Sequence, residues 1–421
     1  MNKAVLFIFI TLLIDITGIG LILPVLPDLI RSVSDTGLSD ATRIGGFLLI
    51  AYAIPQFLCA PILGALSDRF GRRPILLLSL FGFGVDNLIM GFAPVLSWLF
   101  IGRIFAGVFG ASISTGLAFI ADISTPEKRA ANFGMVGAAF GLGFILGPLI
   151  GGFLGEVGTR LPFFVAAGLS FANVIFGFFV LPESLKPENR RPFEWRRANP
   201  FGALIKVSRN RIVLGLIVAF LLSEIAHHAY QSTWTFYTIE RFQFSSGTIG
   251  LSLGVFGLLY ALVNGWLIRV VMPRVGPVNA VWLGLGFTMT AFLGLGLLNT
   301  EWLFWIMLLP AALGGFLTPA MQGIMANETP DNAQGELQGA IASLKGIGAI
   351  LGPVMMTQLF AHFTADGSAM PLYLPGAPFL AGLALLVIAL IPIVDALRRY
   401  RRLNDRGKEP VPDSGLSKRP H

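Results

Sequence analysis

The segment LSWLFIGRIFAGVFGASISTGLAFIA (residues 96–121) is long and apolar enough to cross a lipid bilayer, yet it contains an arginine. A guanidinium stays charged in proteins and is costly in hydrocarbon, so such a residue normally faces a cavity or a paired carboxylate. Few other ionisable residues lie well inside apolar runs. The set is Arg103 with Asp15, Asp86, Glu224 and Lys345. These five charges predict a coupled transport site inside a membrane protein.

Composition supports this class. The chain of 421 residues is 54% hydrophobic and 13% charged, whereas soluble proteins average about 25% charged residues. Apolar runs recur from end to end, and helices can satisfy their own backbone in lipid. We therefore expect an all-α protein embedded in the lipid bilayer. Twelve spans are predicted, at about 4–30, 43–66, 75–95, 97–121, 130–154, 162–181, 211–238, 247–270, 277–298, 302–326, 336–361 and 374–397.

Lys and Arg predict the orientation, because they concentrate in cytoplasmic loops. Of the 30 such residues, four (Arg31, Arg43, Arg160, Arg241) fall in outer loops if the N-terminus is cytoplasmic. Two more lie within spans, which leaves 24 on the cytoplasmic side. We therefore expect a multi-pass protein of the bacterial inner membrane with both termini inside. This distribution explains the net charge of +7 without a nucleic-acid partner.

The chain divides into two halves that repeat. GLGFILGP (141–148) recurs as GIGAILGP (346–353), and 346 minus 141 is 205 residues. RFGRRP (69–74) has a weaker counterpart in RVGPVN (274–279) at the same offset. Chance similarity between Gly- and Pro-rich helices is the alternative. A duplication predicts two pseudo-symmetric six-helix bundles that rock about a central site. The predicted parts are bundle 1–181, cytoplasmic linker 182–210, bundle 211–397 and a disordered cytoplasmic tail 398–421.

The loop GALSDRFGRRP (64–74) predicts a conformational latch. Its glycines permit a tight turn, and Arg69 and Arg72 obey the positive-inside rule. Asp68 does not, so we expect it to cap the next helix or to bond across the two halves. Asp122, at the inner end of span four, is the expected partner of Arg72. The alternative is an ordinary charged turn.

Span five contains GAAFGLGFILGPLIGG (137–152), in which small residues recur along one helix face. Such stripes permit close contact between helices, and Pro148 is expected to kink the span. We predict that Gly143, Gly147 and Pro148 pack between the two halves and seal the outer side.

These segments resemble the major facilitator superfamily, and within it the twelve-span drug–proton antiporters. LFIGRIFAGVFGA (99–111) and LPESL (181–185) add to this resemblance. DITGIGLILPVLP (15–27), AYAIPQFLCAPILG (51–64) and PAMQGIMANETP (319–330) are similar to the tetracycline–proton antiporters.

The resemblance implies roles in proton coupling, drug–metal binding or gating for five positions. They are Asp15, Gln56, Asp68, Asp86 and Arg103. Two positions depart from the family. Thr288 stands near the place of an aspartate in span nine, and Tyr260 near that of a histidine in span eight.

Span seven contains an acid and histidines that could replace the two family residues missing from spans eight and nine. Glu224, His227 or His228, and Gln231 are three, four and seven residues apart, so they share one helix face. A glutamate in the membrane beside an imidazole that titrates near neutral pH can pass protons. Both histidines cannot face the cavity, so one is expected to be structural. An inert hydrogen-bonded pair is the alternative for this face.

The depth of a residue in the membrane indicates which of the remaining charges can pair. Asp86 and Arg103 each lie about 10 Å below the outer surface at 1.5 Å per residue, which predicts an ion pair. The pair is either functional or purely structural. Lys345 lies ten residues into span eleven, where we expect it to balance an acid or to set drug selectivity. Trp234, Phe236 and Tyr237 are expected to anchor the membrane interface, with drug contact as the alternative.

The sequence thus predicts a monomeric antiporter that exports a tetracycline-like drug, free or as a chelate of a divalent metal, by alternating access. The proton gradient drives it, and neither a resident cofactor nor a protein metal site is expected. Proton coupling is assigned to Asp15, Glu224, His228, His227 and Asp86. Substrate binding is assigned to Asp15, Gln56, Arg103, Asp86, Gln231, Gln322 and Lys345. Gating is assigned to Asp68, Arg69, Arg72, Asp122, Gly143, Gly147 and Pro148.

Three alternatives remain. A broad exporter of lipophilic cations would use the same machinery for another cargo. A membrane-embedded enzyme is disfavoured, because the chain has no H-E-x-x-H, G-x-S-x-G or nucleotide-binding loop. A sensor that has lost transport is disfavoured by the intact Asp68 and Arg103 motifs.

Overall fold

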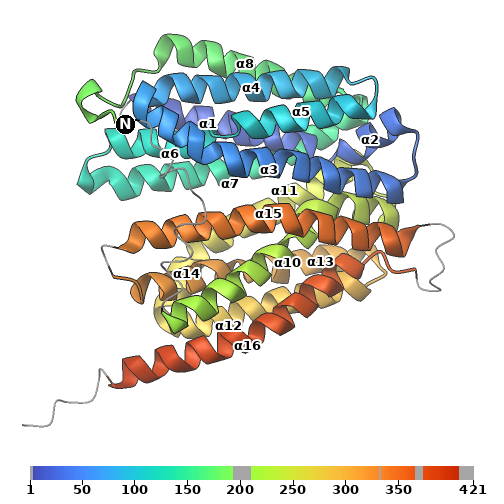
Figure 1. Ribbon diagram of the computed structural model, residues 1–421. Coiled ribbons are helices and arrows are strands. Elements are labelled where there is room, and N and C mark those ends of the chain that lie inside the picture. The colour runs from blue at the N-terminus through green and yellow to red at the C-terminus, as the bar shows by residue number, and fades with distance from the viewer. Residues whose placement is uncertain (1–2, 193–209, 331–332, 366–372, 407–421) are drawn as a thin grey trace, which may run out of the picture.

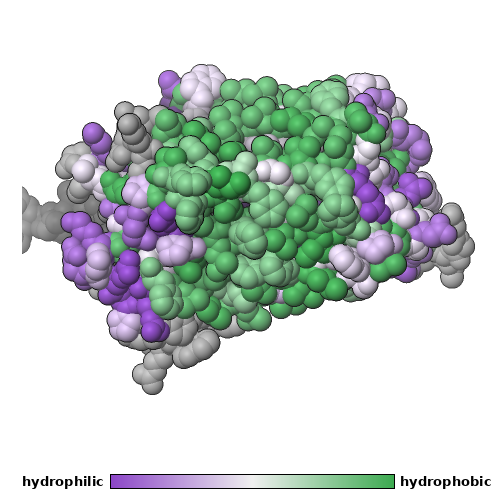
Figure 2. Space-filling model, turned by 90° about the horizontal axis from the view of Figure 1, so that it is seen from above, coloured by the Kyte–Doolittle hydropathy of each residue, from purple (hydrophilic) through white to green (hydrophobic). Residues whose placement is uncertain are grey.

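The computed structural model describes residues 3–192, 210–330, 333–365 and 373–406, and these residues form helices without strands. Long helices run nearly parallel to one another in two groups (Figure 1). Apolar side chains form a broad band around the middle of the molecule, while hydrophilic side chains gather at its two ends (Figure 2). This arrangement suits a bilayer with water on both sides, and it confirms the predicted all-α membrane fold.

The N-terminal half follows the predicted spans closely, with one exception. Span one ends at Ile22 rather than Ile30, because Pro24 and Pro27 cannot continue its backbone hydrogen bonding, and a separate short helix follows. The helices of this half are α1 (Lys3–Ile22), α2 (Leu26–Ser34), α3 (Leu38–Phe70), α4 (Arg72–Phe92), α5 (Leu96–Phe109), α6 (Ser112–Ile123), α7 (Pro126–Val157) and α8 (Leu161–Val180), followed by the short 3₁₀ turn η1 (Pro187–Asn189).

The C-terminal half begins at Arg211. Its elements are α10 (Arg211–Phe242), α11 (Ser246–Leu262), the π-helical turn η3 (Val263–Leu267), α12 (Ile268–Leu297), α13 (Glu301–Leu313), the 3₁₀ turn η4 (Gly314–Phe316), α14 (Leu317–Asn327), α15 (Gln334–Thr364) and α16 (Ala377–Arg406).

The continuous helical stretch Ser246–Leu297 has 52 residues. At 1.5 Å per residue it would be about 78 Å long, far more than the roughly 30 Å of a bilayer core. Gly276 interrupts it with non-helical angles (φ 76°, ψ 161°), so the stretch makes two crossings. With these two, the described residues make twelve crossings, as predicted.

The last helix, α16, continues past Leu397 to Arg406. The first part of the predicted tail is therefore helical rather than disordered, because residues 398–406 contain no Pro or Gly to end the helix. Residues 407–421, and residues 193–209 of the predicted linker, lie outside the described part of the chain.

The backbone carries the predicted repeat. Gly71 (φ 111°) and Gly276 (φ 76°) are the positive-φ glycines of the described residues, and 276 minus 71 is 205. The break between α5 and α6 contains Gly110, and the break between α13 and α14 contains Gly315, again 205 residues later. Turns and helix breaks thus recur at the offset that the sequence motifs show.

We call the end where α1 begins and α16 ends the terminal end, and the opposite end the far end (Figure 1). Four hydrogen bonds between described residues join the two halves, and all four lie toward the far end. They are Ser39 Oγ to Ala361 O (2.7 Å), Thr235 Oγ1 to Leu23 O (3.1 Å), Ser245 Oγ to Glu156 Oε1 (2.9 Å) and Ser246 Oγ to Gly152 O (3.1 Å).

A set of residues along one face of α15, between positions 338 and 360, shows where the halves separate; we call it the α15 stripe. Positions spaced three or four apart lie on one helix face. Toward the terminal end the stripe is exposed, at Ala349 it is half-buried, and toward the far end it is buried. The exposed members are Gln338, Ala342 and Lys345, and the buried ones are Gly352, Met356 and Phe360.

Neighbouring positions of α15 show where this stripe points. A Cβ at Gly348 or Gly352 would meet Glu224 or His228 of α10. A Cβ at Gly346 would meet Phe57 of α3. The stripe lies between these two directions on the helix and so points between α10 and α3, into the space between the halves. That space is closed toward the far end and open toward the terminal end.

Candidate functional site

Asp15 lies on α1 and is 3% exposed. Its carboxyl group accepts a hydrogen bond of 2.5 Å from Ser112 Oγ. Ser112 is the first residue of α6, directly after the break at Gly110 and Ala111. Because a hydroxyl can donate or accept, the contact can persist whether the carboxyl group is ionised or protonated. This bond therefore connects α1 to the start of α6 beside the helix break.

Asp86 and Arg103 form the ion pair that depth predicted, between α4 and α5. Asp86 is fully buried and the Arg103 side chain is 15% exposed. The preceding Gly102 permits the contact, since a Cβ there would lie 2.8 Å from Asp86 Oδ1. Asp86 Oδ1 and Arg103 Nε are buried without a hydrogen-bond partner among the described residues. Removing either charge would leave the other buried and uncompensated, which is strongly unfavourable.

Tyr52 and Gln56 on α3 connect this pair to the helix break. The Arg103 guanidinium lies 6.0 Å from the centre of the Tyr52 ring. Gln56 Nε2 donates to Tyr52 Oη (2.7 Å) and to the carbonyl of Gly110 (3.3 Å). Gln56, Asp86 and Arg103 are thus joined through Tyr52 into one polar chain, and Asp15 is bonded to Ser112, two residues after the Gly110 carbonyl that Gln56 contacts.

The residues of α10 for which proton coupling was predicted differ in burial. Glu224 is half-buried, and Gln231 is exposed although it lies one turn from Thr235, whose hydroxyl bonds across to Leu23. This face therefore borders the space between the halves. His228 is 9% exposed, packs against Gly352, and has no partner for Nδ1 among the described residues.

His227 points away from this face. Its ring makes an edge contact with Tyr230, at 5.4 Å between centres. Tyr230 in turn stacks on Phe292 at 4.9 Å, within the core of the C-terminal half. His227 thus packs on Tyr230 while staying partly exposed, whereas His228 is buried against Gly352 of α15.

The two positions that depart from the family lie around the break in span ten. A Cβ at Gly314 would meet the Thr288 side chain, and one at Gly315 would lie 2.8 Å from Asn264 and 3.0 Å from Tyr260. Asn264 belongs to the π-helical turn η3, a local distortion often found at functional sites. Gln322 follows on α14, half-buried, and no contact with the other candidates joins it to them within the described residues.

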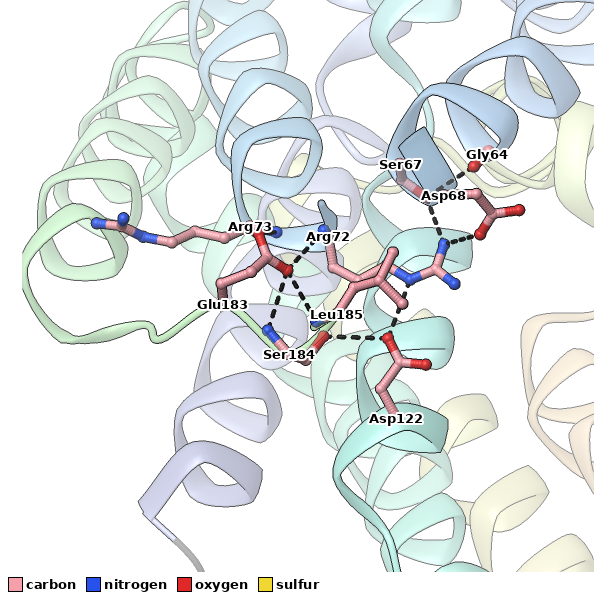
Figure 3. Close-up of polar contacts among 9 residues, drawn as sticks. All are labelled: Gly64, Ser67, Asp68, Arg72, Arg73, Asp122, Glu183, Ser184 and Leu185. Atoms are coloured by element: carbon pink, nitrogen blue, oxygen red, sulfur yellow. Dashed lines mark hydrogen bonds and ion pairs between the residues drawn. The ribbon is translucent and has the colours of Figure 1, made fainter. Parts of the chain in front are cut away.

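The second loop forms a network at the terminal end (Figure 3). Arg72 Nη1 contacts Asp68 Oδ1 and Ser67 Oγ, both at 2.6 Å, while Arg72 Nε donates to Asp122 Oδ2 at 3.1 Å. Ser184 Oγ donates to the same Asp122 oxygen, at 3.1 Å. The predicted Arg72–Asp122 contact is confirmed.

The prediction for Asp68 itself was wrong. Asp68, near the end of α3, pairs across the turn at Gly71 with Arg72, the first residue of α4, which is a local contact four residues along the chain. The cap of α4 is instead Glu183, whose oxygens accept from the backbone N–H groups of Arg72 (2.9 Å) and Arg73 (3.3 Å) (Figure 3). A carboxylate here complements the positive end of the helix dipole. We call this cluster (Ser67, Asp68, Arg72, Asp122, Glu183, Ser184) the loop network, and it lies within the N-terminal half.

Comparison with known proteins agrees with this geometry. Residues 8–353 match the family described as the Major Facilitator Superfamily. The chain belongs to the Major Facilitator Superfamily. It is a membrane transporter rather than an enzyme, as the sequence predicted.

Several curated relatives are tetracycline resistance proteins of Escherichia coli. The class C protein is 38% identical over 94% of this chain and 97% of its own length. The class B protein is 34% identical over 86% of this chain and 90% of its own. These matches bear out the resemblance stated from the motifs.

Solved structures support the superfamily fold. The human organic anion transporter MFSD10 (TETRAN) is 25% identical, with a TM-score of 0.67 over 93% of this chain and 99% of that one. The nucleoside transporter NupG has a TM-score of 0.74 over 95% of this chain and 100% of that one, at 14% identity, which shows the fold alone.

The glycines of span five pack on two sides in this major facilitator protein. Gly143 and Gly147 face α1, since a Cβ at either would lie 2.7 Å from Ile16 or Gly20. They therefore pack within one half, and their predicted place between the halves was wrong. Gly152 takes that place against α11, where a Cβ would lie 3.0 Å from Gly250. A helix has several faces, and spacing alone does not say which neighbour each face meets.

Pro148 contributes to both sides. Its ring lies against Gly20, and its carbonyl lies against Gly250 of the C-terminal half. This residue therefore lies at the interface, as predicted.

Two other predictions for this transporter need correction. Arg69 is exposed and lies 5.1 Å from the ring centre of its neighbour Phe70, outside the loop network. Trp234, Phe236 and Tyr237 are at most 4% exposed, so they belong to the protein interior rather than the membrane interface. Trp234 Nε1, for example, donates to Ser252 Oγ inside the half.

Sequence reasoning missed Ser112, Tyr52, Glu183 and Ser184. Ser112 follows the glycine of a broken span, which is a weak signal. Glu183 and Ser184 lie in the quoted LPESL segment, where an acid just beyond a span could have suggested a cap for a neighbouring helix.

Proposed function

We propose that this transporter exports tetracycline-like drugs from bacteria in exchange for protons. The observation that carries the cargo assignment is the similarity to tetracycline resistance proteins, at 38% identity over 94% of the chain for class C. Classes B and E are similar over 86% and 93% of the chain. Any divalent metal would travel as part of the cargo, chelated by the drug, and not as a resident cofactor.

Proton coupling would rest on carboxyl groups that can bind a proton or support the drug, but not both equally. Asp15 has a neutral hydroxyl as its partner, and Glu224 has no hydrogen bond or ion pair among the described residues. Protonation of such a group shifts the affinity of the drug, and by linkage the drug shifts the affinity of the proton. Asp86 is held by Arg103, so its role would be structural, with His228 as the proton-exchanging neighbour of Glu224.

Alternating access would come from rocking of the halves about the space that α10 and α15 border. In the described residues this space is open toward the terminal end. The positive-inside distribution supports a cytoplasmic position for that end, and both chain termini would then be cytoplasmic. The loop network would hold the N-terminal helices together as one body while the halves move. Because both halves of the site come from one chain, the monomer would be sufficient.

Everted membrane vesicles with an imposed pH gradient test this function. We expect wild-type vesicles to accumulate tetracycline, and Glu224→Gln to bind the drug while losing proton-driven accumulation. If Glu224→Gln transports normally and Asp15→Asn does not, coupling resides in the N-terminal half. Accumulation of a lipophilic cation but never of tetracycline would contradict the proposed cargo.

A further inference from the structure

The charges inside the membrane fall into two kinds. Asp86 is paired with Arg103, and Asp15 is hydrogen-bonded to Ser112. Lys345, by contrast, makes no hydrogen bond and no ion pair with any residue in the described part of the chain. A charged ammonium group inside the membrane is costly, and Lys345 is too far from either end of α15 for its side chain to reach the water at the membrane surface. Such a residue is therefore expected to have a function.

The position of Lys345 shows what it can reach. It is the last exposed residue on the α15 stripe before the stripe becomes buried at Gly352. That stripe points into the space between the halves. Lys345 therefore presents three N–H donors at the innermost point of the open space, where a cargo molecule would stop.

Glu224 lies nearby without neutralising this charge. It adjoins Gly348, one turn from Lys345, and the Lys345 charge acts on its carboxyl group. The two groups do not form an ion pair within 4.0 Å in the described residues. An ammonium and a carboxylate that face one space without contact leave room for a ligand that carries both signs.

The charge also discriminates between forms of a drug. A free tetracycline near neutral pH carries an enolate oxygen and an ammonium group. In a chelate, the oxygens are occupied by a divalent cation and the drug presents positive charge. Lys345 attracts the first form and repels the second, and in a partly dry site this difference is larger than in water.

We propose that Lys345 is a specificity-determining residue that binds the anionic oxygens of the drug directly, so that the cargo is the metal-free zwitterion. Glu224 faces the cationic group of the same molecule. The ammonium of Lys345 supplies the positive charge that a chelated metal would otherwise bring. This inference rests on the proposed function, because it names the form in which the tetracycline-like drug is bound.

The test measures tetracycline uptake into everted vesicles with EDTA on both sides of the membrane, and again with excess Mg²⁺. Wild type is expected to transport in EDTA at least as fast as in Mg²⁺. Lys345→Gln should raise KM for the metal-free drug by about tenfold with a smaller change in maximal rate, as expected for loss of one charged hydrogen bond. Adding Mg²⁺ should reduce that difference.

Two variants serve as controls. Lys345→Arg keeps the charge and should restore most of the affinity. Lys186→Gln removes an exposed charge outside the spans and should leave KM unchanged. Since Lys345 is exposed and makes no described contact, its loss is not expected to prevent folding.

Three outcomes would overturn the inference. If wild type requires Mg²⁺, or if Lys345→Gln matches wild type in EDTA, the drug is not held through Lys345, although the proposed function stands. If wild type transports no tetracycline with or without Mg²⁺, the proposed function fails, and the inference fails with it.

Discussion

The two halves share a backbone plan but distribute charge differently. Arg103 in the N-terminal half corresponds to Leu308 in the other, and Asp86 corresponds to Ala291, each at the offset of 205 residues. Leu308 and Ala291 are fully buried. Where one half holds a buried ion pair, the other therefore holds two buried apolar side chains at the corresponding positions.

This difference suggests a division of labour. In the N-terminal half, charged side chains pair with one another in the Asp86–Arg103 pair and in the loop network. The C-terminal half leaves Glu224 and Lys345 unpaired among the described residues and turns them toward the space between the halves. Backbone breaks recur at the same offset in both halves, while the side chains at corresponding positions differ in charge.

The largest expected effect comes from giving the N-terminal half the residues of its partner. Asp86→Ala alone should lower the free energy of unfolding by about 3–5 kcal/mol, because it strands the buried Arg103 charge. The double variant Asp86→Ala with Arg103→Leu should recover most of this loss, since it leaves no buried charge and places at both positions the buried apolar residues of the other half, Ala291 and Leu308. Thermal unfolding of the purified protein in detergent measures both, and a double variant no more stable than the single one would contradict the comparison.

The two loop glycines allow a sharper test. Gly71 and Gly276 have positive φ, so an alanine at either should cost about 1–3 kcal/mol through backbone strain. At Gly71 the new methyl group would also collide with the Glu183 carboxylate, whereas Gly276 has open space around it. We expect Gly71→Ala to lower the unfolding midpoint more than Gly276→Ala does. Equal effects would indicate that the cap on α4 adds no stability.

Gly147 and Gly352 are also related by the repeat, and they meet different neighbours. A methyl group on Gly147 would lie 2.7 Å from the Gly20 backbone, which cannot move aside. On Gly352 it would lie 2.5 Å from the His228 ring and 2.7 Å from its Cβ, so rotation of the ring relieves only part of the clash. Overpacking costs about 1–3 kcal/mol, and we expect Gly147→Ala at the upper end and Gly352→Ala at the lower. Gly137→Ala, in open space, is the control, and unfolding midpoints rank the three.

The smallest effects concern exposed arginines. Arg69 and Arg274 are related by the repeat, and neither forms an ion pair in the described residues. Arg69→Gln and Arg274→Gln should each change stability by less than about 0.5 kcal/mol. Arg72→Gln removes three contacts of the loop network and should cost about 1 kcal/mol, with transport slowed a few-fold. Initial uptake rates of the three variants, compared at matched protein levels, measure these effects. If Arg69→Gln slowed uptake as much as Arg72→Gln, Arg69 would belong to the loop network, contrary to its position in the structure.

Sequence reasoning succeeded where a contact depends on depth in the membrane. Asp86 and Arg103 lie at equal depth on spans joined by a short loop. The helical rise of about 1.5 Å per residue was therefore enough to predict their pairing. Arg72 and Asp122 lie at the same ends of their spans, and their contact followed in the same way. The offset of 205 residues likewise predicted the paired backbone features, because duplicated motifs keep their turns.

It failed where the outcome depends on rotation about a helix axis. Gly143 and Gly147 were predicted to face the other half, yet they face α1. Spacing shows that residues share a face but not which neighbour that face meets. Asp68 failed for another reason: a partner four residues away competed with the distant one. Glu183 was missed because its target, the start of α4, is more than a hundred residues away in the chain.

The seal at the far end bears on how such a protein evolves. Three of its four described hydrogen bonds end on a backbone carbonyl, of Leu23, Gly152 or Ala361. A carbonyl is present whatever side chain the codon specifies, so mutation at these three positions does not remove the acceptor. Each bond contributes only about 1 kcal/mol, which lets the seal form and part in every cycle. For these three bonds, only the donor hydroxyls of Ser39, Thr235 and Ser246 depend on the side chains that the gene encodes.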